Sequence, residues 1–192
     1  TEVIVLISKP PGPNTAQELA KYLARMRKPV VLNFIGLSSA IEGGDKVFIT
    51  KTLEGAALRA ASLIRNEAFQ EKVFTEEMSK VLQLAESEYK KFSGKQRYVR
   101  GLYSGGTVCS ESTLILADFV PTVTSNMPPR AELEMKDTKV SVAHALVDLG
   151  DEEFTVGRAH PMIDPFVRKQ RFLQEARDPE TAVILLDVVL GY

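Results

Sequence analysis

Short aliphatic runs alternate with segments of helical spacing along the whole chain, and this alternation limits the possible folds more than any other feature. The runs at residues 3–7 and 30–35 are continuously apolar apart from Asn33, and further predicted strands lie at residues 98–103, 143–149 and 183–190. Such runs are typical of strands that are buried on both faces, as in parallel sheets. Strands separated by helices predict an α/β fold with doubly wound parallel sheets.

The helical segments carry sequence signals for their first residues. Thr15 and Glu18 have the spacing of a capping box. Thr52 is placed to cap a second helix, and Asp164 followed by Pro165 predicts an N-cap with proline at the first helical position.

These elements fall into two α/β halves of similar plan. Residues 1–70 form the first half, whose third strand is a short one at 47–49. Residues 71–97 are rich in Glu and Lys at helical spacing and predict a connecting helix. Residues 98–192 form the second half, and within it residues 121–139, rich in Pro, Thr and Ser, predict a long loop.

Both ends of the chain lie close to predicted strands. The chain begins in a strand without an initiator methionine and stops at Gly191-Tyr192, directly after another strand. An α/β protein normally continues from such a strand into a loop and a helix. We therefore expect an interior piece of a longer protein, with the second half truncated at its carboxyl end.

The composition narrows the class of partner and compartment. The formal net charge is −1, which gives no strong field for nucleic acid or an anionic membrane. Cys109 is the single cysteine, so an intrachain disulfide is excluded and a reducing compartment fits. The sequence has no run of about 18 apolar residues and no signal peptide. These features predict a cytoplasmic protein, and the charge excludes a class of partners without naming one.

The most informative local feature is the turn Ser104-Gly105-Gly106-Thr107, between a predicted strand and a helix. Ligands of open α/β sheets bind at the carboxyl ends of strands. Glycines let the backbone approach a ligand, and a helix amino terminus offers N–H groups and a partial positive charge. Gly105, Gly106 and Thr107 are therefore candidates for binding phosphate or carboxylate. A tight turn without a ligand is the alternative.

A second candidate region is the loop from Asp148 to Asp164. Arg158 can pair with a carboxylate or phosphate through two hydrogen bonds. His160 can act as acid, base or nucleophile, and Asp148 can orient a base or a metal-bound water. The alternatives are that Asp164 only caps a helix and that His160 only bonds its own loop. His144, at the start of a strand, is predicted to be structural.

Weaker candidates lie elsewhere. Lys9, beside two prolines, can meet an anion, but a surface lysine on a rigid loop is the alternative. Cys109 lies in the first turns of a helix, where the dipole favours a thiolate, but a small buried cysteine is the commoner case. No CxxC, HExxH or carboxylate cluster with metal spacing occurs, so no metal is predicted.

Several segments together carry a family resemblance. They are VIVLISKPP at 3–11, GLYSGGT at 101–107, VDLGD at 147–151, TVGRAHPMIDP at 155–165 and LLDVVLGY at 185–192. They resemble the FdrA family, whose members are similar to a fusion of the two succinyl-CoA synthetase subunits, within the ADP-forming acyl-CoA synthetases. The resemblance covers most of the chain.

This resemblance implies two flavodoxin-like, three-layer domains. Residues 1–70 would correspond to the carboxyl-terminal domain of the α-subunit, and residues 98–192 to the matching domain of the β-subunit. A CoA-binding Rossmann domain would precede Thr1, and the remainder of the parent would follow Tyr192. The resemblance also implies CoA and a nucleotide in the parent, a phosphate group at the glycine turn, and association with further chains.

One departure from the family pattern concerns the phosphorylated histidine of such synthetases. The corresponding loop, residues 36–46, contains no histidine, and His160 lies in the other half. Three hypotheses therefore stay open. The first is an acyl-CoA synthetase-like ligase. The second is a subunit of an oxamate carbamoyltransferase in purine nitrogen breakdown, with the glycine turn on the phosphate of carbamoyl phosphate and Arg158 on a carboxylate. The third is a non-catalytic assembly scaffold.

Overall fold

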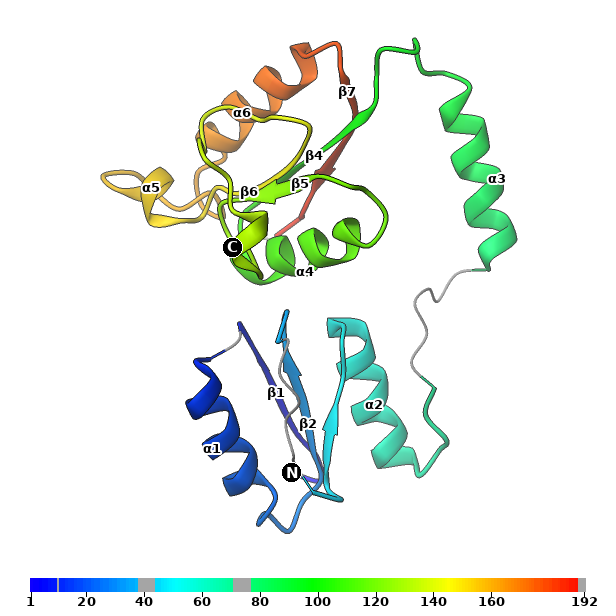
Figure 1. The fold of residues 1–192 in the computed structure, drawn as a ribbon, viewed down its shortest axis with the longest axis vertical. Coiled ribbons are helices and arrows are strands. Elements are labelled where there is room, and N and C mark those ends of the chain that lie inside the picture. The colour runs from blue at the N-terminus through cyan, green and yellow to red at the C-terminus, as the bar shows by residue number, and fades with distance from the viewer. Residues whose placement is uncertain (10, 38–43, 71–76, 190–192) are drawn as a thin grey trace. The chain divides into compact units, whose positions relative to one another are not determined.

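The computed structural model describes residues 1–9, 11–37, 44–70 and 77–189 (Figure 1). The chain separates into two compact units, Thr1–Thr75 and Glu76–Tyr192. Each unit is a parallel sheet with helices packed on it. The predicted α/β fold with parallel sheets is therefore confirmed.

The first unit has a three-stranded sheet in the order β1-β2-β3. Helix α1 packs on one face, where Ala16 and Ala20 contact the side chains of Val30 and Leu32. Val31 and Asn33 point to the opposite face because side chains alternate along a strand, and helix α2 packs against β2 and β1. The elements are β1 (Ile4–Ser8), α1 (Pro13–Leu23), β2 (Val30–Phe34), β3 (Val47–Ile49) and α2 (Leu53–Arg65).

The predicted caps have different outcomes. Thr52 caps α2 as expected, because its Oγ1 accepts a hydrogen bond from the Gly55 N–H at 2.9 Å. The capping box at Thr15 and Glu18 is wrong. Helix α1 begins at Pro13, with Gly12 as N-cap. Proline at the first helical position has a preset φ and no N–H to satisfy, which moves the start ahead of Thr15.

The second unit has a four-stranded parallel sheet in the order β5-β6-β4-β7. Leu102 and Val147 pack on one face with Val167 of α6. Tyr103 and Leu146 pack on the other face with residues of α4, and Figure 1 shows these two helices on opposite sides of the sheet. The elements are α3 (Met78–Tyr89), β4 (Tyr98–Tyr103), α4 (Gly106–Ala117), β5 (Val123–Ser125), η1 (Ala131–Leu133), β6 (His144–Asp148), α5 (Glu152–Thr155), α6 (Phe166–Arg177) and β7 (Thr181–Leu186).

Two predicted loops contain short elements. The loop predicted for residues 121–139 contains strand β5, which pairs with β6, and the 3-10 helix η1. The loop that follows Asp148 contains the single-turn helix α5. A three-residue strand among Pro, Thr and Ser has no period to detect, because its position is fixed by pairing with a distant strand.

The remaining boundaries differ in smaller ways. Helix α6 begins at Phe166 with Pro165 as N-cap, and Asp164 Oδ1 accepts from the Phe166 N–H at 3.0 Å. Asp164 therefore accepts the first N–H of α6 from the position before the N-cap, whereas the sequence predicts Asp164 as the N-cap itself. The connecting helix is present as α3, which groups with the second unit, while residues 71–76 lie outside the described residues. Strand β7 ends at Leu186, and residues 190–192 also lie outside them.

Candidate functional site

The carboxyl ends of β4, β6 and β7 meet the amino terminus of α4 at one edge of the second sheet, because parallel strands end at the same edge. Gly105 is the N-cap of α4, with extended backbone angles of φ −152° and ψ 127°. In the part of the chain that the structure describes, no side chain caps α4 and its first turn carries no acidic residue. The first N–H groups of α4 therefore keep their partial positive charge for a ligand.

The space beside Gly105 is open. A Cβ atom built on Gly105 would meet no heavy atom within 4 Å. Gly105, Gly106 and Thr107 are each partly exposed. The predicted anion-binding residues thus lie at an accessible helix terminus.

Ser104, the first residue of the glycine turn, is hydrogen bonded to two side chains that we did not predict. Its N–H donates to Asp187 Oδ1 at 3.0 Å and Oδ2 at 2.9 Å. Arg168 Nη1 donates to Ser104 Oγ at 2.8 Å, and Arg168 Nη2 lies 3.2 Å from Asp187 Oδ1 and also donates to the Asp187 carbonyl. Helix α6 and the end of β7 therefore fix the backbone that enters the turn.

Asp148 lies at the carboxyl end of β6 with 4% of its surface exposed. Its Oδ1 accepts from the Gly150 N–H at 2.9 Å. The side chain of Asn126 accepts from the Asp148 N–H at 2.8 Å and donates to the Asp148 carbonyl at 2.9 Å. Asp148 thus shapes the loop after β6, and Asn126 anchors that loop to the segment after β5.

His160 approaches the same edge. A Cβ atom built on Gly150 would lie 2.5 Å from His160 Nε2 and 2.7 Å from the Ser104 carbonyl oxygen. His160 Nδ1 accepts from the Met162 N–H at 3.2 Å, so a neutral ring carries its proton on Nε2. The structure therefore brings His160 and Ser104 together around Gly150, and His160 also makes the hydrogen bond within its own loop that was the alternative.

Arg158 is placed differently. Its side chain is exposed, and the structure shows no hydrogen bond or ion pair for its guanidinium group among the described residues. Arg168, on α6, is the arginine that contacts Ser104. The role proposed for Arg158 as a carboxylate ligand stays a prediction.

The other candidates lie in less suitable surroundings. Cys109 is fully buried, with its Sγ 3.4 Å from Ser125 Oγ, which fits the alternative of a small core residue. Burial raises the pKa of the Tyr103 hydroxyl. Lys9 is exposed after β1, in the first unit.

His144 lies at the opposite, amino end of the strands. Its Nδ1 accepts from the Val99 N–H at 3.1 Å, and its ring stands edge-to-face on Tyr98 with centroids 5.4 Å apart. Burial, and then the positive charge of Arg100, lower the pKa of His144. These contacts fit the structural role that the sequence predicts.

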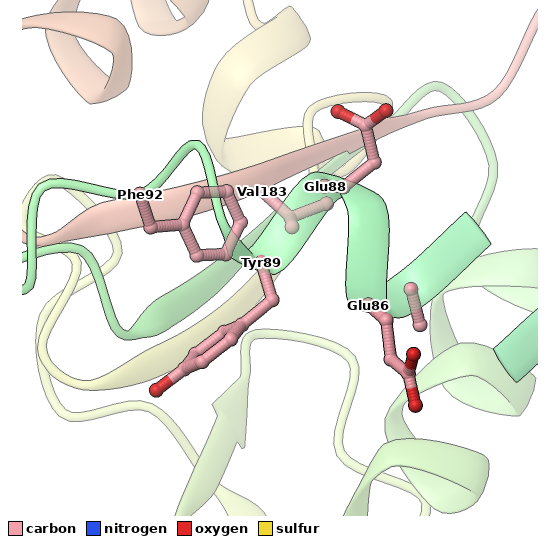
Figure 2. A pocket seen from close by; sticks show the side chains of 6 residues that line it. Glu86, Glu88, Tyr89, Phe92 and Val183 are labelled. Carbon is pink, nitrogen blue, oxygen red and sulfur yellow. The ribbon is translucent and has the colours of Figure 1, made fainter. Parts of the chain in front are cut away.

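A hollow in the second unit lies between the end of the α3 segment and β7, and Figure 2 shows its lining by Tyr89, Phe92 and Val183 with Glu86 and Glu88 at the rim. Val183 pairs with Val99, in the amino-terminal half of β4. The hollow is largely apolar, so it is not a candidate for anion chemistry.

Two further findings concern only the described ranges with their gaps. They contain no group of three or more His, Cys, Asp or Glu residues that could hold a metal ion. They also contain no helix that is long and apolar enough to cross a membrane.

Known proteins match this chain in two ways. Residues 102–192 match the family described as CoA-ligase. All 192 residues align at 38% identity with "Uncharacterized protein YahF" of Escherichia coli (strain K12), of which they cover 36%. The chain thus spans about a third of the length of that relative. The segment that matches the CoA-ligase family, residues 102–192, contains the glycine turn, the His160 loop and Asp187.

Proposed function

We propose that this chain is part of an acyl-CoA synthetase-like ligase of the FdrA type, and that its CoA-ligase domain binds the phosphate group of an acyl phosphate at the amino terminus of α4. The observation that carries the proposal is the open, uncapped start of α4 at Gly105, within the segment that matches the CoA-ligase family. A phosphate oxygen is a natural acceptor for free N–H groups at a helix amino terminus.

The residues around this edge suit a leaving phosphate. When the acyl carbon–oxygen bond breaks, the electron pair remains on the phosphate oxygen. Backbone N–H groups of Gly106 and Thr107 stabilise that negative charge, as donors aimed at developing charge do in general. Arg168 contacts Ser104 Oγ at 2.8 Å and shares its positive charge with Asp187. His160 Nε2, which faces Gly150 and the Ser104 carbonyl, can donate a proton at the same edge.

CoA would supply the thiol that accepts the acyl group in such a ligase. By the family resemblance, CoA and a nucleotide bind in other parts of the parent protein, and further chains or domains complete the site. In this proposal, the described residues of this chain bind the phosphate group.

Carbamoyl transfer is the second candidate, and one sequence observation favours it. Residues 36–46 contain no histidine, so the phosphohistidine of the usual synthetases has no equivalent there. Transfer of a carbamoyl group between phosphate and oxamate needs a phosphate site and a carboxylate site, without a phosphohistidine. The α4 turn would hold the phosphate in either reaction, with Arg158 as the predicted carboxylate ligand.

The test is calorimetric titration of the chain with acetyl phosphate and carbamoyl phosphate. Gly105→Val is the informative variant, because valine fits the extended backbone at Gly105 and its side chain would enter the open space. Gly12→Val is the matched control, since Gly12 is also an N-cap with no heavy atom near its Cβ position. Binding should be lost in Gly105→Val and kept in Gly12→Val. Equal binding in both variants would place the phosphate elsewhere.

Titration of the full-length parent separates the two reactions. Binding of CoA favours the ligase, whereas binding of carbamoyl phosphate without CoA favours the carbamoyltransferase. A parent that binds none of these ligands would leave the assembly scaffold as the better hypothesis.

A further inference from the structure

Asp187 already places a carboxylate beside the candidate anion site. Both of its oxygens accept the Ser104 N–H, at 3.0 and 2.9 Å, one residue before the N-cap of α4. Its side chain is 12% exposed and that of Arg168 is 18% exposed. Asp187 is therefore an internal carboxylate in the kind of surroundings that attract a bound anion.

Arg168 contacts both Asp187 and Ser104. Its described hydrogen bonds and ion pair go only to Ser104 and Asp187. A guanidinium group carries five N–H donors and pairs with phosphate as well as with carboxylate. An anion that arrives at α4 would compete with Asp187 for Arg168, and the Asp187 charge would oppose that anion.

We propose that the Arg168–Asp187 pair sets the selectivity of this site for phosphoryl dianions over carboxylates. The inference rests on the proposed function, because it assumes that an anion binds at the α4 turn. Asp187 is tethered, so its effective concentration at Arg168 is far above that of a free carboxylate. A carboxylate monoanion offers Arg168 nothing that Asp187 does not already supply, whereas a phosphate dianion offers more charge and a third oxygen.

The experiment is calorimetric titration of the chain with inorganic phosphate and with acetate. The variants are Asp187→Asn, Arg168→Gln and Gly105→Val, each checked for folding by thermal denaturation. Asparagine keeps an acceptor for the Ser104 N–H but removes the charge. We expect Asp187→Asn to tighten phosphate binding on the order of tenfold and to introduce measurable acetate binding. Arg168→Gln should weaken phosphate binding on the order of tenfold.

The outcomes separate this inference from the proposed function. If Gly105→Val abolishes phosphate binding but Asp187→Asn leaves both affinities unchanged or lowers them, the anion site stands and the role of the pair is wrong. If only Asp187→Asn binds phosphate, the charge of Asp187 excludes phosphate as well as carboxylate from the wild-type site, and the proposed selectivity for phosphoryl dianions is wrong. If no variant binds phosphate, both the site and the role of the pair are overturned.

Discussion

The carboxyl edges of the two sheets differ in how their polar groups are paired. In the first unit, Asn33 Nδ2 donates to the Thr50 carbonyl at 3.1 Å, but Asn33 Oδ1 and Thr50 Oγ1 are buried without a partner among the described residues. In the second unit, Asp148 and Asp187 each accept backbone N–H groups at the same kind of edge. Among the described residues, the hydrogen bonds from backbone N–H groups to carboxylates at a strand end thus belong to the second sheet.

The difference extends to how helices are held. Helix α1 is fixed to its sheet by apolar contacts. Helix α6 also carries buried charges, because Arg171 Nε lies 2.5 Å and Arg100 Nε 3.1 Å from the two oxygens of Glu175. Arg100 also pairs with Asp178 at 2.8 Å. Such a network orders the second unit strongly, but loss of one member leaves uncompensated buried charge.

The largest effect expected is therefore from Glu175→Gln. Glu175 lies between Arg100 and Arg171 and also accepts from Ser141 Oγ at 2.6 Å. Its neutralisation leaves two buried guanidinium groups with too little negative charge, and should lower the free energy of unfolding of the second unit by about 3–5 kcal/mol. Hydrogen exchange should show protection lost in β4 and kept in β2.

The control is Glu180→Gln, which removes an exposed pair with Arg97 at 3.4 Å. Its effect should stay below about 1 kcal/mol, as for other surface ion pairs. Equal effects of the two variants would show that the Glu175 network does not stabilise the second unit more than a surface pair does.

Gly150→Ala should have the next largest effect. Its Cβ would lie 2.7 Å from the Ser104 carbonyl oxygen, a backbone atom that cannot move aside cheaply. We expect a loss of about 1–3 kcal/mol, as for other overpacked sites, together with displacement of His160. Urea denaturation measures the loss, and Gly12→Ala, where the added Cβ meets nothing within 4 Å, should change little. Wild-type stability of Gly150→Ala would mean that the loop after β6 is not fixed against Ser104.

These contacts also explain how far the sequence could predict the molecule. Local patterns predicted the longer strands, the Thr52 cap and the turn at Gly105. Strand β5 and the start of α1 were missed, because one depends on pairing with a distant strand and the other on the preset φ of Pro13.

The candidate site was predictable only in part, for a related reason. Ser104 lies 64 residues from Arg168 and 83 from Asp187 along the chain. The glycines could be identified from their own neighbours, whereas Arg168, Asp187 and Asn126 act through contacts that no local spacing reveals. Asp187 lay inside the strand predicted for residues 183–190, and only the structure, in which β7 ends at Leu186, places it at a strand end.

The third prediction concerns pH and the amino end of the second sheet. Only a neutral imidazole can accept from the Val99 N–H, and the pKa of His144 is lowered in the fold by burial and by Arg100. The unfolded chain therefore binds this proton more readily than the folded chain does. The stabilisation is present above the unfolded pKa and is lost as pH falls through the folded pKa.

Denaturation midpoints between pH 7.5 and 5 test this. We expect the second unit of the wild-type chain to lose stability as pH falls, and His144→Gln to reduce that dependence. His160→Asn, which removes the other of the two histidines, is the control and should retain the dependence. If the slope survives unchanged in His144→Gln, another group is responsible.

The smallest effect tests the contrast between unpaired and paired hydroxyl groups. Thr50 is buried and its Oγ1 lacks a partner among the described residues, so Thr50→Val removes a desolvated hydroxyl at nearly constant shape and should raise stability by up to about 1 kcal/mol. In the second unit, Thr113 is equally buried but donates to the Cys109 carbonyl at 2.7 Å, so Thr113→Val should lower stability by about 1 kcal/mol. Urea midpoints of the two variants should move in opposite directions. A destabilised Thr50→Val would mean that its hydroxyl is paired in solution, and the contrast between the two units at that edge would be smaller.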